Sequence, residues 1–282
     1  MSFAYHEPTM WAAAHELLAR GGDSTALAGG TAFTLLLRQG LIRPSAVVSL
    51  RRVSDARAIR ADAHGGLSIG AMATHTDVVR SPVVRKTWPE LADAAAKVAT
   101  LRVRNQATIG GSVAHADPAS DLPVMLAALD AQAVVRSAKG TRRVPIDELI
   151  VDTFTTSLSP GELIESIEIP ARGRYTRAVY LKFTLRSIDD YATVSVAVRA
   201  DLAQGYVDRP RIFLGAVGPR PMRAVSVENA IREDSADPRP IPEAAALVRS
   251  EIDPIADVRG SAEYKREMAR VFTERALRAL YP

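Results

Sequence analysis

Two short stretches, each with a pair of glycines beside hydroxyl residues, are the part of this sequence best suited to chemistry. Residues 28–31 read Ala-Gly-Gly-Thr, and residues 108–112 read Thr-Ile-Gly-Gly-Ser. Glycine lets the backbone approach a ligand closely, and free N–H groups at a helix start attract phosphate. Two such turns predict a clamp for a pyrophosphate that needs no lysine, because backbone amides neutralise its charge. A pair of tight structural turns is the alternative.

Polar residues follow the second glycine pair, just before another expected helix. Asp121 stands at the expected N-cap, and its carboxylate is also suited to accept hydrogen bonds from a ribose or ribityl hydroxyl. For His115 we expect a structural or solvent-facing role rather than proton transfer. Neither glycine pair fits the nicotinamide fingerprint or the P-loop, whose glycine spacings differ.

The composition is that of an ordinary globular protein, since 47% of the 282 residues are hydrophobic and 24% are charged. Cysteine is absent, which excludes disulfides, thiolate zinc sites, cysteine-ligated iron–sulfur clusters and a cysteinyl flavin bond within this chain. The formal charge is only +4 and aromatic residues make up 5%, so we predict no nucleic-acid partner. No apolar run approaches the ~18 residues that span a bilayer. The first residues also lack a signal-peptide pattern, and we expect a cytoplasmic protein.

The elements expected from hydrophobic spacing fall into three parts. The first part alternates, with a helix at 9–20, a strand at 25–28, a helix capped by Thr31 and a strand at 46–50. In the second part we expect strands at 58–61, 67–70 and 163–169, a hairpin of 133–137 with 141–145, helices at 76–80, 89–99 and 121–130, and a polar, arginine-rich link before residue 107.

The main boundary is expected at residues 170–173, where proline and glycine interrupt the pattern. Beyond it we expect strands at 178–185, 192–200 and 211–217, then helices at 224–232, 242–249 and 261–280. Strands followed by helices are typical of a small α+β domain. We therefore predict domains at residues 1–55, 56–173 and 174–282.

Five stretches in this order and spacing resemble a known family. They are residues 28–31, 102–111 (RVRNQATIGG), 115–121 (HADPASD), 163–170 (LIESIEIP) and 180–192 (YLKFTLRSIDDYA). Together they resemble the FAD-binding medium subunit of molybdenum hydroxylases, the family of carbon monoxide dehydrogenase and xanthine dehydrogenase. The resemblance implies an α+β fold: a two-subdomain FAD-binding fold of the vanillyl-alcohol-oxidase type, followed by a small α+β C-terminal domain.

The same resemblance implies which residues hold the pyrophosphate of FAD. They are Ala28, Gly29, Gly30, Thr31 and Ala32 in the first stretch, and Thr108, Ile109, Gly110 and Gly111 in the second. Relatives often have Asp or Ser at the position of Ala32. One hydrogen bond to the cofactor is therefore expected to be missing or supplied by water.

Five further residues match cofactor-contacting positions of the family. Asp121 matches an acidic residue near the sugar and phosphate portion, and Val98 a residue beside the adenine. Ile164 matches an apolar position whose backbone lies by the isoalloxazine ring. Lys182 matches a lysine at the polar edge of that ring, where a cation stabilises the reduced anion. Tyr180 matches an aromatic that covers one ring face in some relatives. Since Tyr180 and Lys182 are two residues apart, they share one strand face, and an exposed Tyr–Lys pair is the alternative.

The resemblance predicts an oxidoreductase subunit that binds FAD non-covalently and transfers electrons. A large partner subunit with a molybdenum cofactor is implied to hydroxylate the substrate, and a small partner with [2Fe-2S] clusters to deliver electrons singly. We predict neither a catalytic base nor a metal site in this chain. One alternative is a self-sufficient flavin oxidase, which needs its own base and a larger second domain. The other alternative is a non-enzymatic nucleotide-binding scaffold.

Overall fold

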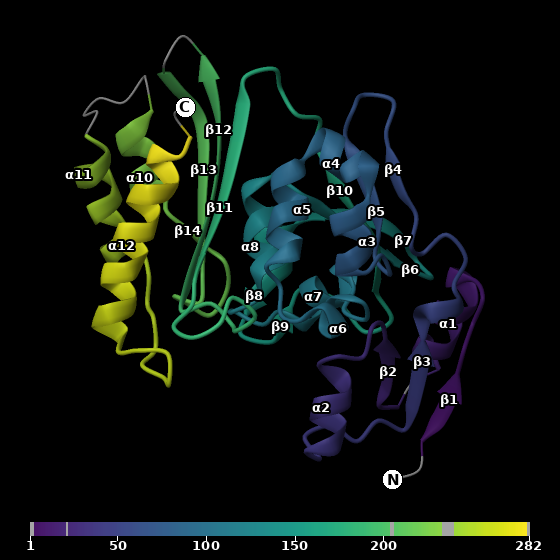
Figure 1. Cartoon of the computed structure of the whole chain (residues 1–282). Coiled ribbons are helices and arrows are strands. Elements are labelled where there is room, and N and C mark those ends of the chain that lie inside the picture. Colours follow the sequence, from purple (N-terminus) through teal and green to yellow (C-terminus); the bar gives the residue numbers. More distant parts are fainter. Residues whose placement is uncertain (1–2, 21, 204–205, 233–239, 281–282) are drawn as a thin grey trace.

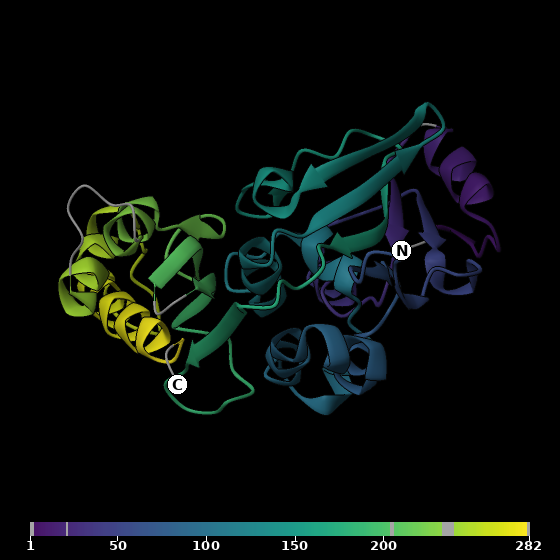
Figure 2. The ribbon, with the colours of Figure 1, turned by 90° about the horizontal axis from the view of Figure 1, so that it is seen from above.

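The computed structural model describes residues 3–20, 22–203, 206–232 and 240–280. In this described part, three main sheets follow one another along the chain, and each has helices of its own (Figure 1). The first sheet and the C-terminal helices lie at opposite ends of the molecule, as the view from above also shows (Figure 2). The mixed helix and strand content confirms the predicted α+β class.

The first part is a small parallel sheet of order β1-β3-β2. Its strands are β1 (Ala4–His6), β2 (Ser24–Leu27) and β3 (Ala46–Ser49), and its helices are α1 (Trp11–Ala19) and α2 (Phe33–Arg38). A short 3-10 turn, η1 (Leu50–Arg52), follows β3. Strand β1 was not predicted, because three residues give no alternation to detect. Strand β2 lies at an edge of this sheet, next to β3.

The second part contains a five-stranded antiparallel sheet of order β4-β5-β10-β6-β7. The strands are β4 (Ile59–Ala61), β5 (Leu67–Gly70), β6 (Gln132–Ser137), β7 (Gly140–Pro145) and β10 (Leu163–Ile169). The helices are α3 (His75–Arg80), α4 (Pro82–Thr87), α5 (Pro89–Ala96), α6 (Leu101–Arg104), α7 (Ile109–His115), α8 (Asp121–Ala128) and α9 (Ile146–Leu149). A two-stranded ribbon of β8 (Ile150–Asp152) and β9 (Thr155–Thr156) completes this part.

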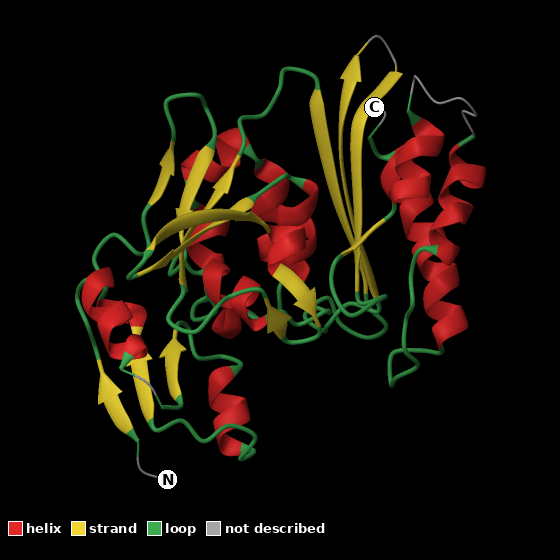
Figure 3. Cartoon of the chain, turned by 180° about the vertical axis from the view of Figure 1, so that it is seen from behind, coloured by secondary structure: helices red, strands yellow, loops and turns green. Residues whose placement is uncertain are grey.

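The third part is a four-stranded antiparallel sheet with helices on one face (Figure 3). The strands are β11 (Thr176–Phe183), β12 (Val194–Ala203), β13 (Tyr206–Gly215) and β14 (Met222–Arg223). The helices are α10 (Val225–Ile231), α11 (Ile241–Ala246), η2 (Leu247–Ser250) and α12 (Ala262–Arg278). The opposite face of the sheet packs on α8, and Tyr180 and Phe213 belong to the same core cluster as the α8 residue Met125.

Four local expectations were wrong. The link before residue 107 contains the helix α6, capped by Thr100, and the second glycine pair lies inside α7 rather than in a turn. Thr31 does not cap α2, whose N-cap is Ala32 without a side-chain bond. Asp121 is the first residue of α8, because Ser120 occupies the extended N-cap position. Two of these differences have a local cause, since the hydroxyls of Thr100 and Thr108 accept the N–H groups of Val103 and Gly111 and so begin a helix at each threonine. Within the described residues, we find no helix long and apolar enough to span a membrane.

Candidate functional site

The first glycine pair ends β2 and leaves its backbone donors free. Gly30 has φ +78°, a left-handed conformation that turns the chain before α2. In the described part of the chain, the N–H groups of residues 29–32 donate to no protein acceptor. Consecutive free N–H groups in such a turn form a concave site for an anion. This stretch therefore has the chemistry that a pyrophosphate requires.

Gly29 has a different role from Gly30, because its backbone lies close to the backbone of Gln106. A Cβ atom at this position would lie 1.9 Å from the carbonyl oxygen of Gln106. No side chain fits there, so glycine lets the first pair lie directly against the residues that precede the second pair. The contact joins the first sheet to the second part of the molecule.

The second glycine pair has its backbone donors already occupied. Ile109 N–H donates to the Ala73 carbonyl at 2.9 Å, and Gly110 N–H donates to the Ala71 carbonyl at 2.9 Å. Gly111 N–H donates to the Thr108 hydroxyl, the N-cap of α7, at 3.1 Å. Because these bonds satisfy the start of the helix within the protein, its backbone has no amide left for a ligand.

The structure brings the two pairs together. A Cβ atom on Gly111 would lie 3.3 Å from the Cβ of Ala28. A Cβ atom on Gly110 would lie 2.5 Å from the Cβ of Ala71, which makes Gly110 a packing requirement of the second part. Thus all nine residues predicted for the pyrophosphate lie around one junction, although only the first stretch offers amides.

A buried polar cluster surrounds Asp121 at the start of α8. Its carboxylate accepts a hydrogen bond from the Tyr180 hydroxyl at 2.5 Å and pairs with the Lys182 ammonium at 2.9 Å. Lys182 also donates to the carbonyl of Lys97, the neighbour of Val98, at 2.9 Å, while Lys97 donates to the Tyr180 carbonyl at 2.9 Å. Tyr180 and Lys182 therefore do share one strand face, and the pair is not exposed.

Burial sets the protonation behaviour of this cluster. It raises the pKa of Asp121 above its usual value, against the opposing effects of Lys182 and Tyr180. It also raises the pKa of the Tyr180 hydroxyl and lowers that of the Lys97 ammonium. Removing one member of such a cluster leaves its partner charged and unpaired, which is strongly destabilising.

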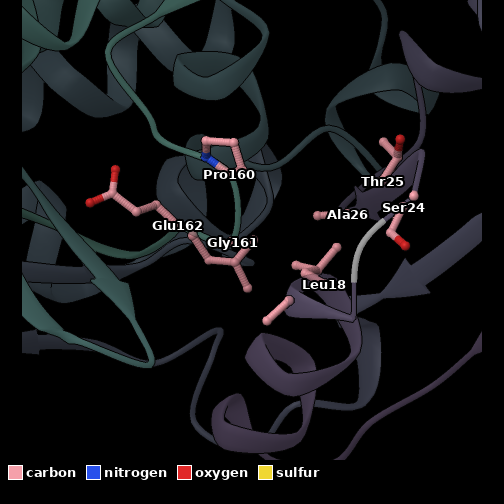
Figure 4. Close-up of a pocket in the computed structure, with 10 residues that line it drawn as sticks. Leu18, Ser24, Thr25, Ala26, Pro160, Gly161 and Glu162 are labelled. Carbon is pink, nitrogen blue, oxygen red and sulfur yellow. The ribbon is translucent and has the colours of Figure 1, made fainter.

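A pocket of about 450 Å³ opens between the first and second parts, beside the edge strand β2 (Figure 4). The end of α1 and residues of β2 form one wall, and residues 160–163, just before Ile164, form the other. The His15 ring holds this second wall, because its Nδ1 lies 3.2 Å from the Gly161 carbonyl. The volume is in the usual range for a small-molecule site.

Comparison with known proteins gives the family. Residues 1–172 match the FAD binding domain in molybdopterin dehydrogenase, and residues 179–280 match the CO dehydrogenase flavoprotein C-terminal domain. The chain belongs to the FAD-binding subunits of the molybdenum hydroxylases. This result confirms the predicted family, the oxidoreductase class and FAD as the cofactor.

Relatives of this flavoprotein family match almost end to end. The chain is 36% identical to the 6-hydroxypseudooxynicotine dehydrogenase complex subunit alpha of Paenarthrobacter nicotinovorans, over 93% of this chain and 88% of the relative. It is 32% identical to the carbon monoxide dehydrogenase medium chain of Hydrogenophaga pseudoflava, over 99% and 97%. A solved carbon monoxide dehydrogenase from Hydrogenophaga pseudoflava superimposes with a TM-score of 0.95 at 34% identity, covering 100% of this chain and 98% of that one.

The predicted flavin-contacting residues fall into two groups in this family fold. Asp121, Tyr180 and Lys182 form one cluster, and Lys182 links it to Lys97, the residue before Val98. Ile164 is buried in β10 and follows directly after the pocket wall. The sequence analysis did not predict the pocket. The local sign in the sequence was the Pro160-Gly161 pair, which is typical of a turn, and in the structure Gly161 has φ +83°.

Proposed function

We propose that this chain is the electron-transferring flavoprotein of a three-subunit molybdenum hydroxylase of the cytoplasm. In this proposal, a small partner subunit with [2Fe-2S] clusters delivers electrons to FAD on this chain, which passes them to an external acceptor. A large partner subunit with a molybdenum cofactor hydroxylates the organic substrate. Bound FAD supplies the ability to exchange one or two electrons. The chain itself binds and orients this cofactor.

The row of free N–H groups at residues 29–32 is the observation that carries this proposal. We infer that these amides hold the pyrophosphate and that Thr108 and the α7 start close the opposite side. The first pair supplies the donors, and Gly29 and Gly111 keep the two segments in contact. Backbone amides hold an anion without a proton that titrates, so binding would not depend on pH near neutrality.

The two groups of residues suit the two ends of FAD, because the pyrophosphate lies in the middle of that molecule. Asp121 and Val98 would serve the adenosine end. Lys182 donates to the residue next to Val98, so we assign it to this end rather than to the polar edge of the ring. Tyr180 is 5% exposed, so we assign it a supporting role for Asp121 rather than a place over the ring. The isoalloxazine ring would occupy the pocket before Ile164.

We retain the proposed domain limits of 1–55, 56–173 and 174–282. The members of each main sheet lie within one of these ranges. The hydrophobic core extends across the limit at residue 173, since Ala178 and Phe213 belong to the core cluster of residues 56–173. The third domain would therefore dock firmly on the flavin-binding part.

The pocket favours electron transfer over a self-sufficient oxidase. An oxidase needs a general base within reach of the proton that it removes. Glu162 is the titratable side chain of the pocket wall, and both of its carboxylate oxygens accept hydrogen bonds from Arg142 at 2.8 Å. That bond lowers the pKa of Glu162, and the carboxylate points away from Ser24 and Thr25 (Figure 4). Such a carboxylate is a poor base.

Titration of the full-length chain with FAD, followed by flavin absorbance and fluorescence, tests the cofactor site. Gly30→Ala should weaken FAD binding, because the substitution strains the turn that presents the amides. Gly40→Ala is the matched control, since Gly40 has a similar φ of +72° with nothing within 4 Å of a Cβ. Equal loss in both variants would mean that strain alone, not the anion site, explains the effect.

Purification of the tagged chain from its native host tests the electron-transfer role. We expect two co-purifying subunits, with molybdenum and iron present by elemental analysis, and flavin reduction on addition of an oxidisable substrate. Flavin reduction by the chain alone, without these partners, would support the oxidase alternative. A folded chain that neither binds FAD nor recruits partners would support the scaffold alternative.

A further inference from the structure

His75 contacts both ends of the segment that carries the second glycine pair. It is the first residue of α3 and is 2% exposed. Its backbone N–H donates to the Ala107 carbonyl at 3.0 Å, and its ring Nε2 lies 2.9 Å from the Ser112 hydroxyl oxygen. Residues 71–75 thus run alongside residues 107–110, and the buried ring contacts the far end of the glycine stretch.

The amides of the second pair are occupied, so its remaining polar contacts come from hydroxyl groups. The Thr108 hydroxyl already accepts the Gly111 N–H, and Thr108 as a residue is 3% exposed. Ser112 is partly exposed and forms its side-chain bond with His75. A hydroxyl both donates and accepts, so Ser112 keeps a further hydrogen bond for a ligand. The direction of that bond depends on where the ring holds the oxygen.

We propose that His75 is a positioning residue of the FAD site, which holds the Ser112 hydroxyl where it meets the pyrophosphate. This inference rests on the proposed function. The Ser112 hydroxyl takes the place of the backbone donors that the second pair lacks. The two walls of the clamp therefore use different chemistry, backbone amides on one side and an oriented hydroxyl on the other.

The surroundings of the His75 ring fix its protonation state. The pKa of His75 is lowered from 6.5 to about 4, chiefly by burial and to a smaller extent by the positive charge of Arg104, while the nearby backbone of Thr108 acts to raise it. The imidazole is therefore neutral at physiological pH. A neutral ring forms one hydrogen bond at Nε2, as donor or as acceptor. Because it carries no charge, it neither repels the Arg104 guanidinium nor attracts the phosphate.

A double-mutant cycle on the full-length chain tests the inference, with the dissociation constant of FAD as the readout. We expect Ser112→Ala and His75→Leu each to raise this constant about tenfold, as for loss of one hydrogen bond. The double variant should be no weaker than either single variant, because both changes remove one interaction. His75→Gln, whose amide reaches the same position, should retain wild-type affinity. His64→Leu, on the exposed turn after β4, is the control.

The outcomes separate this inference from the proposed function. If the wild-type chain binds no FAD, the proposed function fails and the inference fails with it. If wild type binds FAD and the two single effects multiply in the double variant, His75 acts independently of Ser112 and the inference is wrong. Unchanged affinity in both single variants would also overturn the inference. Urea unfolding of each variant without FAD identifies any that fail to fold, and Ser112→Ala then decides through its own affinity.

Discussion

The two glycine pairs share a sequence pattern and differ in what the backbone around them does. Both combine two glycines with hydroxyl residues. At residues 29–32 the amides have no acceptor within the described chain, whereas at residues 109–111 each amide is bonded to the protein. The first pair is left outside regular structure by the left-handed Gly30. The second pair is inside a helix that Thr108 caps.

This difference shows that glycine has two separate uses at one site. In the first pair, Gly30 shapes a binding loop. In the second pair, Gly110 has its N–H committed to Ala71 and allows the helix to pack on that residue. A substitution in the first pair should therefore change ligand affinity, and one in the second should change stability.

The largest expected effect is the loss of FAD binding in Gly29→Ala. The new Cβ would collide with the Gln106 carbonyl oxygen at 1.9 Å, so the first loop must leave the junction. We expect the dissociation constant of FAD to rise about 1,000-fold, which corresponds to about 4 kcal/mol. Isothermal titration of the full-length chain measures this change. Affinity close to that of wild type would refute the close-packed clamp.

Acid should lower the stability of the folded chain through protonation of His75, which contacts the segment of the second glycine pair. Its pKa of about 4 in the folded chain lies below the ordinary 6.5, so the unfolded chain takes up the proton first as the pH falls. The free energy of unfolding should therefore decrease between pH 6.5 and about 4, by about 3 kcal/mol in total. Urea unfolding across this range measures it, and only the difference from His75→Gln counts, since other groups also titrate. Parallel pH curves for the two proteins would rule out a neutral buried ring.

Gly110→Ala should destabilise the chain by about 1 to 3 kcal/mol, the usual cost of overpacking. The cause is contact of the new Cβ with Ala71, whose Cβ and Cα lie 2.5 and 2.9 Å from it. The midpoint of urea unfolding reports the loss. FAD affinity of the folded protein should fall less than in Gly29→Ala. A larger loss of FAD affinity in Gly110→Ala than in Gly29→Ala would assign the anion site to the second pair.

The smallest effect distinguishes the two threonines. Thr108→Ala removes the cap of α7 and should cost about 1 kcal/mol of stability. Thr31→Ala should change stability by less than about 0.5 kcal/mol, because Thr31 caps no helix. Thermal unfolding of both variants beside wild type tests the pair. Equal losses would show that Thr31 supports the fold in a way that its position does not suggest.

Much of the fold could be predicted from spacing alone. The antiparallel hairpin of β6 and β7, the strand β10 and the long helix α12 lie where hydrophobic alternation or helical spacing placed them. Three short elements, β1, α4 and β14, were not predicted, because segments of two to six residues show little periodicity. The contacts of Asp121 were equally hidden, since Tyr180 and Lys182 reach it from a strand about 60 residues later in the chain.

By itself, the sequence determined the family, the cofactor class, the exclusion of cysteine-ligated clusters and the residues that gather at the glycine junction. Those properties depend on residue types and on their order along the chain. Only the tertiary structure decided which glycine pair keeps free amides, that Tyr180 is enclosed, and that a pocket opens beside the edge strand β2. The physical reason is that a backbone N–H is identical in both pairs, and its chemistry depends on whether a distant carbonyl, such as that of Ala71 or Ala73, lies within hydrogen-bonding distance.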